Sequence, residues 1–132
     1  MEITIISKKK KDYLLIETKA ILVTTADLIS QSQLLYEEIV KHGFKKVLID
    51  ESETRLPNDL IPYFDLVKNY VAEFPAEIRQ LKVAVVADKT YEVIANTWET
   101  LCASRGLNYC AFTSIGQAEE WLLAKMNQYG ID

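Results

Sequence analysis

Three short apolar runs mark the second half of the chain, and each ends abruptly at a polar residue. The runs cover residues 47–49, 83–87 and 109–112, and they are followed by Asp50, Asp88 and Thr113. A stretch with helical periodicity comes after each run. Apolar runs without alternation are typical of strands covered on both faces, and alternating strands and helices form parallel crossovers. The pattern therefore predicts an α/β fold with parallel strands at its centre.

The residues ahead of the first run predict two more strands and a helix. Residues 2–7 alternate polar and apolar side chains, and residues 13–18 predict a second strand, antiparallel to the first, which residues 20–23 continue after a bend. Between them, four consecutive lysines at 8–11 are expected at a solvated hairpin tip. Thr24 with Asp27 three residues later resembles a capping box, and Gly43 is a typical helix end.

The most regular amphipathic pattern follows the polar loop at 51–55. A helix is expected to begin near Pro57 or Asn58, with Pro62 in its first turn, where a missing N–H costs little. Pro75 ends it, and residues 76–80 are expected to add one more turn. The spacing predicts that the inward face of this helix consists of Leu60, Phe64, Val67, Val71 and Phe74.

Two further helices complete the predicted order. One follows Asp88 and ends at Gly106, and the last begins at Ser114, whose hydroxyl can cap it. The predicted architecture is one domain over residues 1–132, with a single mixed sheet in the order β-β-α-β-α-β-α-β-α and parallel later strands.

Composition and charge narrow the classes of function. The chain is 49% hydrophobic and 26% charged, as ordinary globular proteins are. A net charge of −4 argues against a nucleic-acid partner, which needs a basic face. No apolar run approaches 18 residues, so no membrane span is expected. Two cysteines and an N-terminus without the pattern of a secretion signal predict a cytoplasmic protein with reduced thiols.

Few residues suit metal or nucleophilic chemistry. Cys102 and Cys110 lack metal-ligand spacing, and His42 is the single histidine of the chain. We therefore expect no metal and no cofactor, and catalysis by a Ser/His/Asp or Cys/His set is disfavoured. The cysteines are expected to be small core residues.

Polar residues at the predicted strand ends form the main candidate site. Asp50, Glu51 and Ser52 leave one strand, and Asp88 leaves the next. On parallel neighbours these residues share one edge of the sheet, where small ligands and anions bind in such folds. Aspartate and serine also cap helices, so the same residues are equally compatible with a purely structural role.

Several segments together resemble a known superfamily. They are residues 46–50 before the long helix, residues 83–88, Ser104-Arg105-Gly106, and Phe112 with residues 118–122. Their order and spacing, from about Tyr13 to Leu123, resemble the STAS superfamily of anti-sigma-factor antagonists and sulfate-transporter tails. The resemblance is closer to its bacterial branch called stage II sporulation protein AA-like.

This resemblance implies a regulatory, non-enzymatic protein-interaction module. In the superfamily a serine near the start of the helix after the central strand is phosphorylated. Ser52 is the loose positional match here, although residues 52–58 lack the Asp-Ser-Ser/Thr-Gly-like stretch of the family.

Three hypotheses about function remain open at this point. The first is binding of a partner protein or a second copy, through Glu51, Ser52, Glu53, Arg55 and the exposed face of the following helix. The second is a small-ligand or lipid pocket between that helix and the sheet ends, formed by Asp50, Tyr63, Phe64, Tyr70, Asp88 and Arg105. The third is an enzyme that uses Asp50, Asp88 and Arg105, which requires these three side chains to converge.

Overall fold

Five strands form one mixed sheet in the computed structural model, which describes residues 2–124. The strands are β1 (Thr4–Lys9), β2 (Leu14–Lys19), β3 (Lys46–Glu51), β4 (Lys82–Ala87) and β5 (Asn108–Phe112). They lie in sequence order; β1 is antiparallel to β2, and all other neighbours are parallel. The predicted fold class is confirmed. Of the predicted domain, residues 1 and 125–132 lie outside the described residues.

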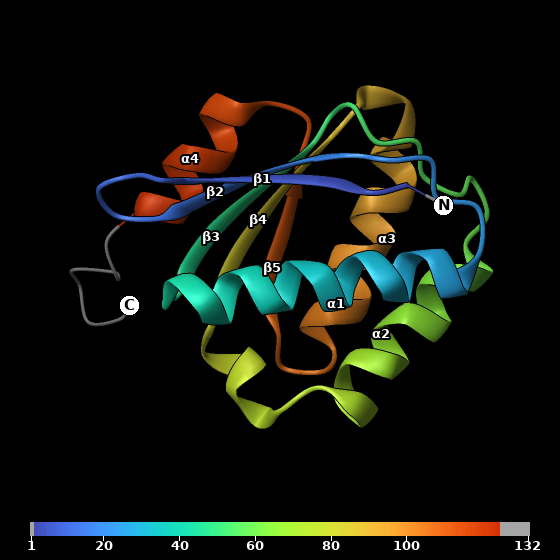
Figure 1. Cartoon of the computed structure of the whole chain (residues 1–132). Coiled ribbons are helices and arrows are strands. Elements are labelled where there is room, and N and C mark those ends of the chain that lie inside the picture. The colour runs from blue at the N-terminus through green and yellow to red at the C-terminus, as the bar shows by residue number, and fades with distance from the viewer. Residues whose placement is uncertain (1, 125–132) are drawn as a thin grey trace.

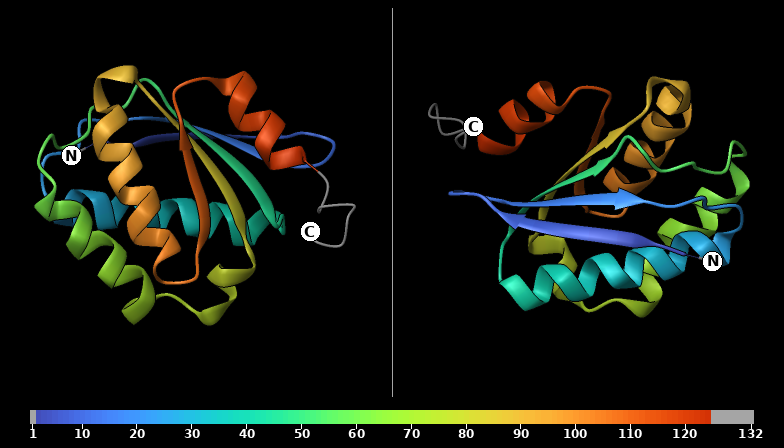
Figure 2. Two further views of the ribbon diagram at one scale, coloured as in Figure 1. Left: turned by 180° about the vertical axis from the view of Figure 1, so that it is seen from behind. Right: turned by 45° about the horizontal axis from the view of Figure 1, so that its top comes forward.

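The helices cover the two faces of the sheet unequally. The helices α1, α2 and α3 lie on one face, and α4 alone lies on the other (Figures 1 and 2). Their bounds are α1 (Thr25–His42), α2 (Ile61–Glu73), α3 (Glu92–Ala103) and α4 (Ile115–Leu123), with short 3-10 turns η1 (Ala76–Gln80) and η2 (Lys89–Tyr91).

Side chains of the central strands alternate between two core layers. Val47 and Ile49 of β3 pack toward α1, whereas Leu48 packs against Ala118 and Leu122 of α4. Because successive side chains of a strand point to opposite faces, a strand covered on both sides is apolar at every position. This explains why the central strands show no alternation in the sequence.

Local capping fixes the ends of α1 as the sequence predicts. The Thr24 hydroxyl accepts from the Asp27 backbone N–H, and the Asp27 carboxylate accepts from the Thr24 N–H, which completes the capping box. Gly43 ends the helix with a φ of 71°, in the left-handed region where glycine carries no steric penalty.

The helix α2 differs from its prediction in both its start and its inward face. It begins at Ile61, with Pro62 in its first turn as expected. The buried residues of α2 are Tyr63, Leu66, Val67 and Tyr70. Of the predicted inward stripe, Val67 is buried and Phe74 packs against the core, but the prediction is wrong for Leu60, Phe64 and Val71, which are 40–50% exposed. The helix carries two overlapping apolar stripes, and the one that contains the tyrosines is buried.

The loop before α2 is tied down by its backbone, which delays the start of the helix. Arg55 exchanges backbone hydrogen bonds of 2.9 and 2.8 Å with Ala20 and Leu22, and this forms a short bridge beyond the end of β2. The Tyr63 hydroxyl then donates to the Pro57 carbonyl at 2.9 Å. These bonds hold residues 55–57 in an extended path across the sheet edge.

The backbone of α2 lies close to its neighbouring helices and reaches the sheet mainly through side chains, such as the Tyr70 ring, which lies 6.2 Å from that of Tyr109 in β5. It contacts α1 on one side and α3 on the other, while α3 runs closely along β5. Figure 2 shows α2 lying between these two helices at the outside of the layer. The backbone of α2 consequently lies away from the central strands beneath it, and the side chains of α2 extend toward them.

The free edge of β5 is partly covered by a side chain. Glu99 of α3 accepts a hydrogen bond of 2.7 Å from the backbone N–H of Ala111, through its Oε1 atom. Because β5 is the last strand of the sheet, this N–H would otherwise be available to another strand.

Within residues 2–124, no helix combines the length and the apolar character that crossing a membrane requires.

Candidate functional site

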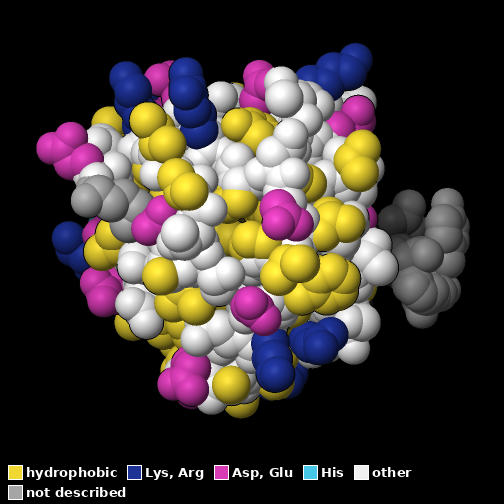
Figure 3. All heavy atoms as spheres, turned by 90° about the vertical axis from the view of Figure 1, so that its right-hand side faces the viewer, with side chains coloured by type: hydrophobic (Ala, Val, Ile, Leu, Met, Phe, Trp, Pro, Cys, Tyr) yellow, Lys and Arg dark blue, Asp and Glu magenta, His cyan; other side chains and the backbone are white. Residues whose placement is uncertain are grey.

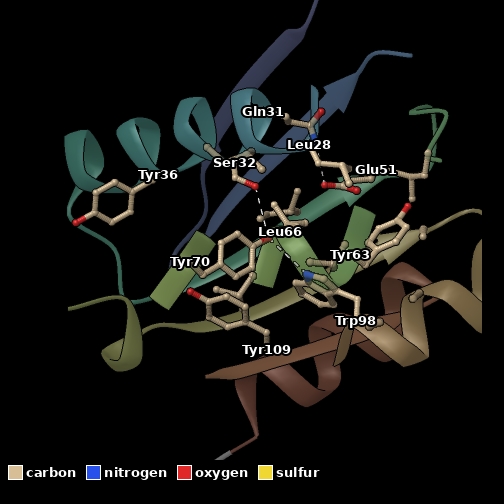
Figure 4. A pocket seen from close by; sticks show the side chains of 18 of the residues that line it. Leu28, Gln31, Ser32, Tyr36, Glu51, Tyr63, Leu66, Tyr70, Trp98 and Tyr109 are labelled. Carbon is tan, nitrogen blue, oxygen red and sulfur yellow. Dashed lines mark hydrogen bonds between the residues drawn. The ribbon is translucent and has the colours of Figure 1, made fainter. Parts of the chain in front are cut away.

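A cavity of about 100 Å³ lies between α1, α2, α3 and the sheet. Its floor is the face of β3, β4 and β5 that α2 covers from a distance, and α2 forms its roof (Figure 4). An engineered apolar cavity of about 150 Å³ takes up benzene, so a space of this size admits part of a small organic molecule without any rearrangement.

The floor of the cavity includes alternate residues of one segment of the sheet. They are Leu81, just before β4, and Val83, Val85 and Ala87 within it. At a rise of about 3.3 Å per residue, this segment is about 20 Å long.

One wall of the cavity is a row of aromatic rings. Neighbouring ring centroids lie 5.2 to 6.2 Å apart along the series Tyr36, Phe74, Tyr70, Tyr109 and Trp98. The Tyr70 hydroxyl lies 3.4 Å from both the Ser32 hydroxyl and the Trp98 indole nitrogen. Burial raises the pKa of Tyr70 well above its usual range, so its hydroxyl stays protonated.

Glu51 lies at the end of the cavity where β3 finishes. Its side chain is 9% exposed, and its Oε2 atom accepts one hydrogen bond of 3.1 Å from the Gln31 amide nitrogen. Figure 4 shows these two side chains meeting between α1 and β3. Among the described residues no cation forms an ion pair with Glu51. Burial, and secondarily the nearby Asp50, raises the pKa of Glu51 to about 7.

Gln31 is the second polar residue at this end. It is 4% exposed, and its Oε1 atom has no hydrogen-bond partner within the described part of the chain. An unpaired buried acceptor costs about 1–3 kcal/mol. The Glu51–Gln31 pair is therefore an unusual arrangement in which acceptor atoms outnumber the donors that face them.

The prediction that Glu51 begins an exposed loop is wrong. Glu51 is the last residue of β3, and it follows Val47 and Ile49 on the inward face. The period of two along the strand was the signal that placed it there. Because Glu51 is acidic and is followed by further polar residues, the sequence pattern favoured a loop over a buried strand end.

The other residues of the predicted contact surface are exposed. Ser52, Glu53 and Arg55 lie at the surface, and Thr54 between them is buried against the Thr18 hydroxyl at 2.6 Å. The Ser52 backbone N–H donates to the Asp50 carboxylate at 3.0 Å, which fixes the turn. These three side chains are accessible to a partner, and Glu51 is not.

The predicted ligand-pocket residues divide into two groups. Tyr63 and Tyr70 line the cavity. Phe64 lies on the outside of α2, and Asp50 is half-buried on the opposite face of the sheet from Glu51, so neither contributes to it. The prediction that these two residues line the pocket is wrong, because Tyr63 and not Phe64 is buried on α2, and strand alternation places Asp50 and Glu51 on opposite faces of the sheet.

Asp88 and Arg105 also lie outside the cavity. The hypothesis of an enzyme required these two side chains to converge with Asp50. Asp50, the last residue but one of β3, and Asp88, which follows β4, do lie at the same end of neighbouring parallel strands, as expected. Asp88 is exposed and caps η2 by accepting from the Thr90 N–H at 2.9 Å. Arg105 precedes β5, whose first residue pairs with the start of β4, so it lies at the opposite edge. The required convergence is absent.

The two cysteines are core or part-buried thiols. Cys102 is fully buried, as predicted, and burial raises its pKa far above the usual range. Burial likewise raises the pKa of Cys110 to about 11. Both are protonated at neutral pH, which lowers their nucleophilicity. In residues 2–124, no group of three or more His, Cys, Asp or Glu side chains is arranged to hold a metal ion.

Comparison with known proteins identifies the fold. Neither protein-family models nor curated proteins match the sequence. A solved structure does match: the 2.25 Å crystal structure of an uncharacterized protein of the DUF3478 family from Shewanella loihica PV-4, which has a SpoIIAA-like fold. The TM-score is 0.55 at 22% identity, over 91% of this chain and 93% of that one.

The chain has a SpoIIAA-like fold. This finding agrees with the resemblance to the stage II sporulation protein AA-like branch of the STAS superfamily. At 22% identity the likeness concerns the SpoIIAA-like fold alone, and the role of the cavity has to be argued from its own residues.

Proposed function

We propose that this SpoIIAA-like domain binds a small, largely apolar molecule in the cavity beneath α2. The observation that carries the proposal is the cavity itself, which is lined by aliphatic and aromatic side chains and has a few polar groups at defined places. Ligand sites in proteins have this composition, because apolar walls supply affinity and a few polar groups orient the ligand.

The position of α2 supports the proposal. A helix packed directly on the central strands would leave no space, but α2 is held by α1 and α3 at its sides. Native interiors are close-packed, and voids larger than a water molecule are few in a domain. A cavity of about 100 Å³ in a chain of this size is therefore unusual, and ligand binding would account for it.

Filling the cavity from α3 is expected to abolish binding without harming the fold. Ala95 lines the cavity, and leucine at this position adds volume with good helix propensity. We expect Ala95→Leu to weaken binding of n-hexanol, an apolar probe, by at least tenfold. Isothermal titration calorimetry measures the affinity, and urea denaturation checks that the folded state is retained.

The matched control is the same substitution on the outside of the same helix. Ala103 is exposed near the end of α3, so Ala103→Leu should bind n-hexanol as the unaltered protein does. Equal affinities for the two variants would contradict a site in this cavity. No measurable binding by the unaltered protein would contradict the proposed function itself.

A second candidate function is binding of a partner protein through the outer face of α2. Ile61 is 66% exposed and Phe64 is 50% exposed, so two large apolar side chains of the first turns of α2 face the surface. Figure 3 shows many hydrophobic side chains on the side of the molecule where α1 and α2 begin. Contiguous exposed apolar patches of this kind mark interaction sites in soluble proteins.

Removing the aromatic anchor of this face is expected to weaken such a complex. Truncating a central aromatic residue of an interface commonly costs more than 2 kcal/mol. We therefore expect Phe64→Ser to reduce capture of a partner from the native cell extract by at least tenfold, as measured by quantitative mass spectrometry. Asp65→Ser, the exposed neighbour on the same helix, is the control. Unchanged capture by Phe64→Ser would contradict a contact on this face.

A further inference from the structure

The charged and polar groups of the cavity restrict the chemistry of its ligand. Of the described residues that line it, Glu51 is the only one with a charged side chain, and no lysine or arginine contributes. A ligand with a carboxylate or phosphate would therefore find no cation at this end. It would instead meet the Glu51 carboxylate, with Asp50 as the next residue along the strand.

The hydrogen-bonding groups at this end are mostly acceptors. The Glu51 carboxylate accepts a single bond, although a carboxylate has about four acceptor positions. Gln31 donates that bond, and its own Oε1 atom is buried without a donor. A head group that donates hydrogen bonds supplies what the protein lacks here.

A buried carboxylate without a cation is costly, and a cationic ligand removes that cost. Buried ionised groups are found paired, or else they are neutral. Within residues 2–124, Gln31 is the only residue that donates a hydrogen bond to the charged form of Glu51. An ammonium group at hydrogen-bond distance would provide both a positive charge and three donors.

We propose that the cavity selects a small apolar primary amine, whose ammonium group binds Glu51 and whose hydrocarbon part lies along the aromatic wall. This inference rests on the proposed ligand-binding function and specifies its ligand class. The apolar floor segment of about 20 Å is longer than a chain of six carbons, so such a chain has apolar side chains beside it along its whole length.

The test compares three probes that share one chain and differ in their head group. They are n-hexylamine, n-hexanol and n-hexanoate, titrated into the full chain at pH 8.5 and followed by calorimetry. We expect n-hexylamine to bind at least tenfold more tightly than n-hexanoate, with n-hexanol between them. In Glu51→Gln the advantage of the amine should disappear, while n-hexanol binding stays within twofold.

A matched control and a pH series make the result specific. Glu53 is an exposed acid two residues away, so Glu53→Gln should keep the preference for the amine.

In the unaltered protein, lowering the pH from 8.5 to 5.5 should weaken the binding of n-hexylamine about tenfold, because Glu51 takes up a proton while the alkyl ammonium stays charged. Asp50 and Tyr63 are the other titratable groups near Glu51, and burial raises the pKa of Tyr63, so its hydroxyl keeps its proton throughout this range. If Glu51→Gln does not fold, the pH series on the unaltered protein still tests whether Glu51 binds the ammonium group.

The outcomes separate this inference from the proposed function. Amine binding that survives in Glu51→Gln, is independent of pH, or is weaker than n-hexanoate binding would overturn the inference. Binding of n-hexanol in the same experiments would leave the proposed function standing. Failure of all three probes to bind would overturn both.

Discussion

Replacing Glu51 by glutamine is expected to stabilise the folded protein by about 3 kcal/mol at pH 8.5. The pKa of Glu51 is raised from 4.5 in the unfolded chain to about 7 in the folded protein. The folded state therefore binds more protons than the unfolded state between these two values. Stability consequently falls as the pH rises from 4.5 to 7, at about 1.4 kcal/mol for each unit of pKa difference. Glutamine keeps the shape of the side chain and carries no charge, so it avoids this loss.

Urea denaturation at pH 5 and pH 8.5 measures the effect. We expect the gain of Glu51→Gln over the unaltered protein to be large at pH 8.5 and small at pH 5. Glu53→Gln, at an exposed position, should change the free energy of unfolding by less than about 0.5 kcal/mol at either pH. Destabilisation by Glu51→Gln at pH 8.5 would mean that the carboxylate makes stabilising contacts beyond its bond from Gln31.

Truncation of Leu48 is expected to cost about 3 kcal/mol of stability. Leu48 is 0% exposed in the central strand β3, where it packs against Ala118 and Leu122 of α4. A change from leucine to alanine at such a site removes buried surface and leaves a void, and measured costs lie at about 2–5 kcal/mol. Since α4 is the single helix on this face of the described structure, no neighbouring helix is placed to fill the void.

The same substitution on α1 provides the control. Leu34 is 40% exposed, so Leu34→Ala should cost less than about 1 kcal/mol in the same urea titration. Leu48 faces away from the cavity, so the folded fraction of Leu48→Ala should bind n-hexanol with unchanged affinity. Equal stability losses for the two variants would show that α4 does not anchor on this strand.

The sheet and its topology could be predicted from the sequence because their signals are local. Apolar runs of strand length, each followed by a helical pattern, specify buried parallel strands with little ambiguity. The capping residues Thr24, Asp27 and Gly43 act within one turn of the chain, so the ends of α1 were also predictable.

The cavity could not be predicted because it depends on the distance between elements. No local sequence signal in α2 indicates that its backbone lies close to α1 and α3 and farther from the central strands. The two apolar stripes of this helix overlap at Val67, and the one with Phe64 is the more apolar in sequence, so the pattern favoured Phe64 over Tyr63 for the inward position. Glu51 could have been placed on the inward face by strand alternation, but the absence of a cation beside it is a property of the folded molecule.

The bond between Glu99 and Ala111 bears on how copies of this protein meet. A last strand with open amides can recruit an identical strand from a second molecule and so grow into a continuous ribbon. Here a carboxylate from α3 occupies one of those amides, and its negative charge discourages an incoming carbonyl. One outward amide of β5 is therefore already bonded within the molecule, which leaves one site fewer for an incoming strand.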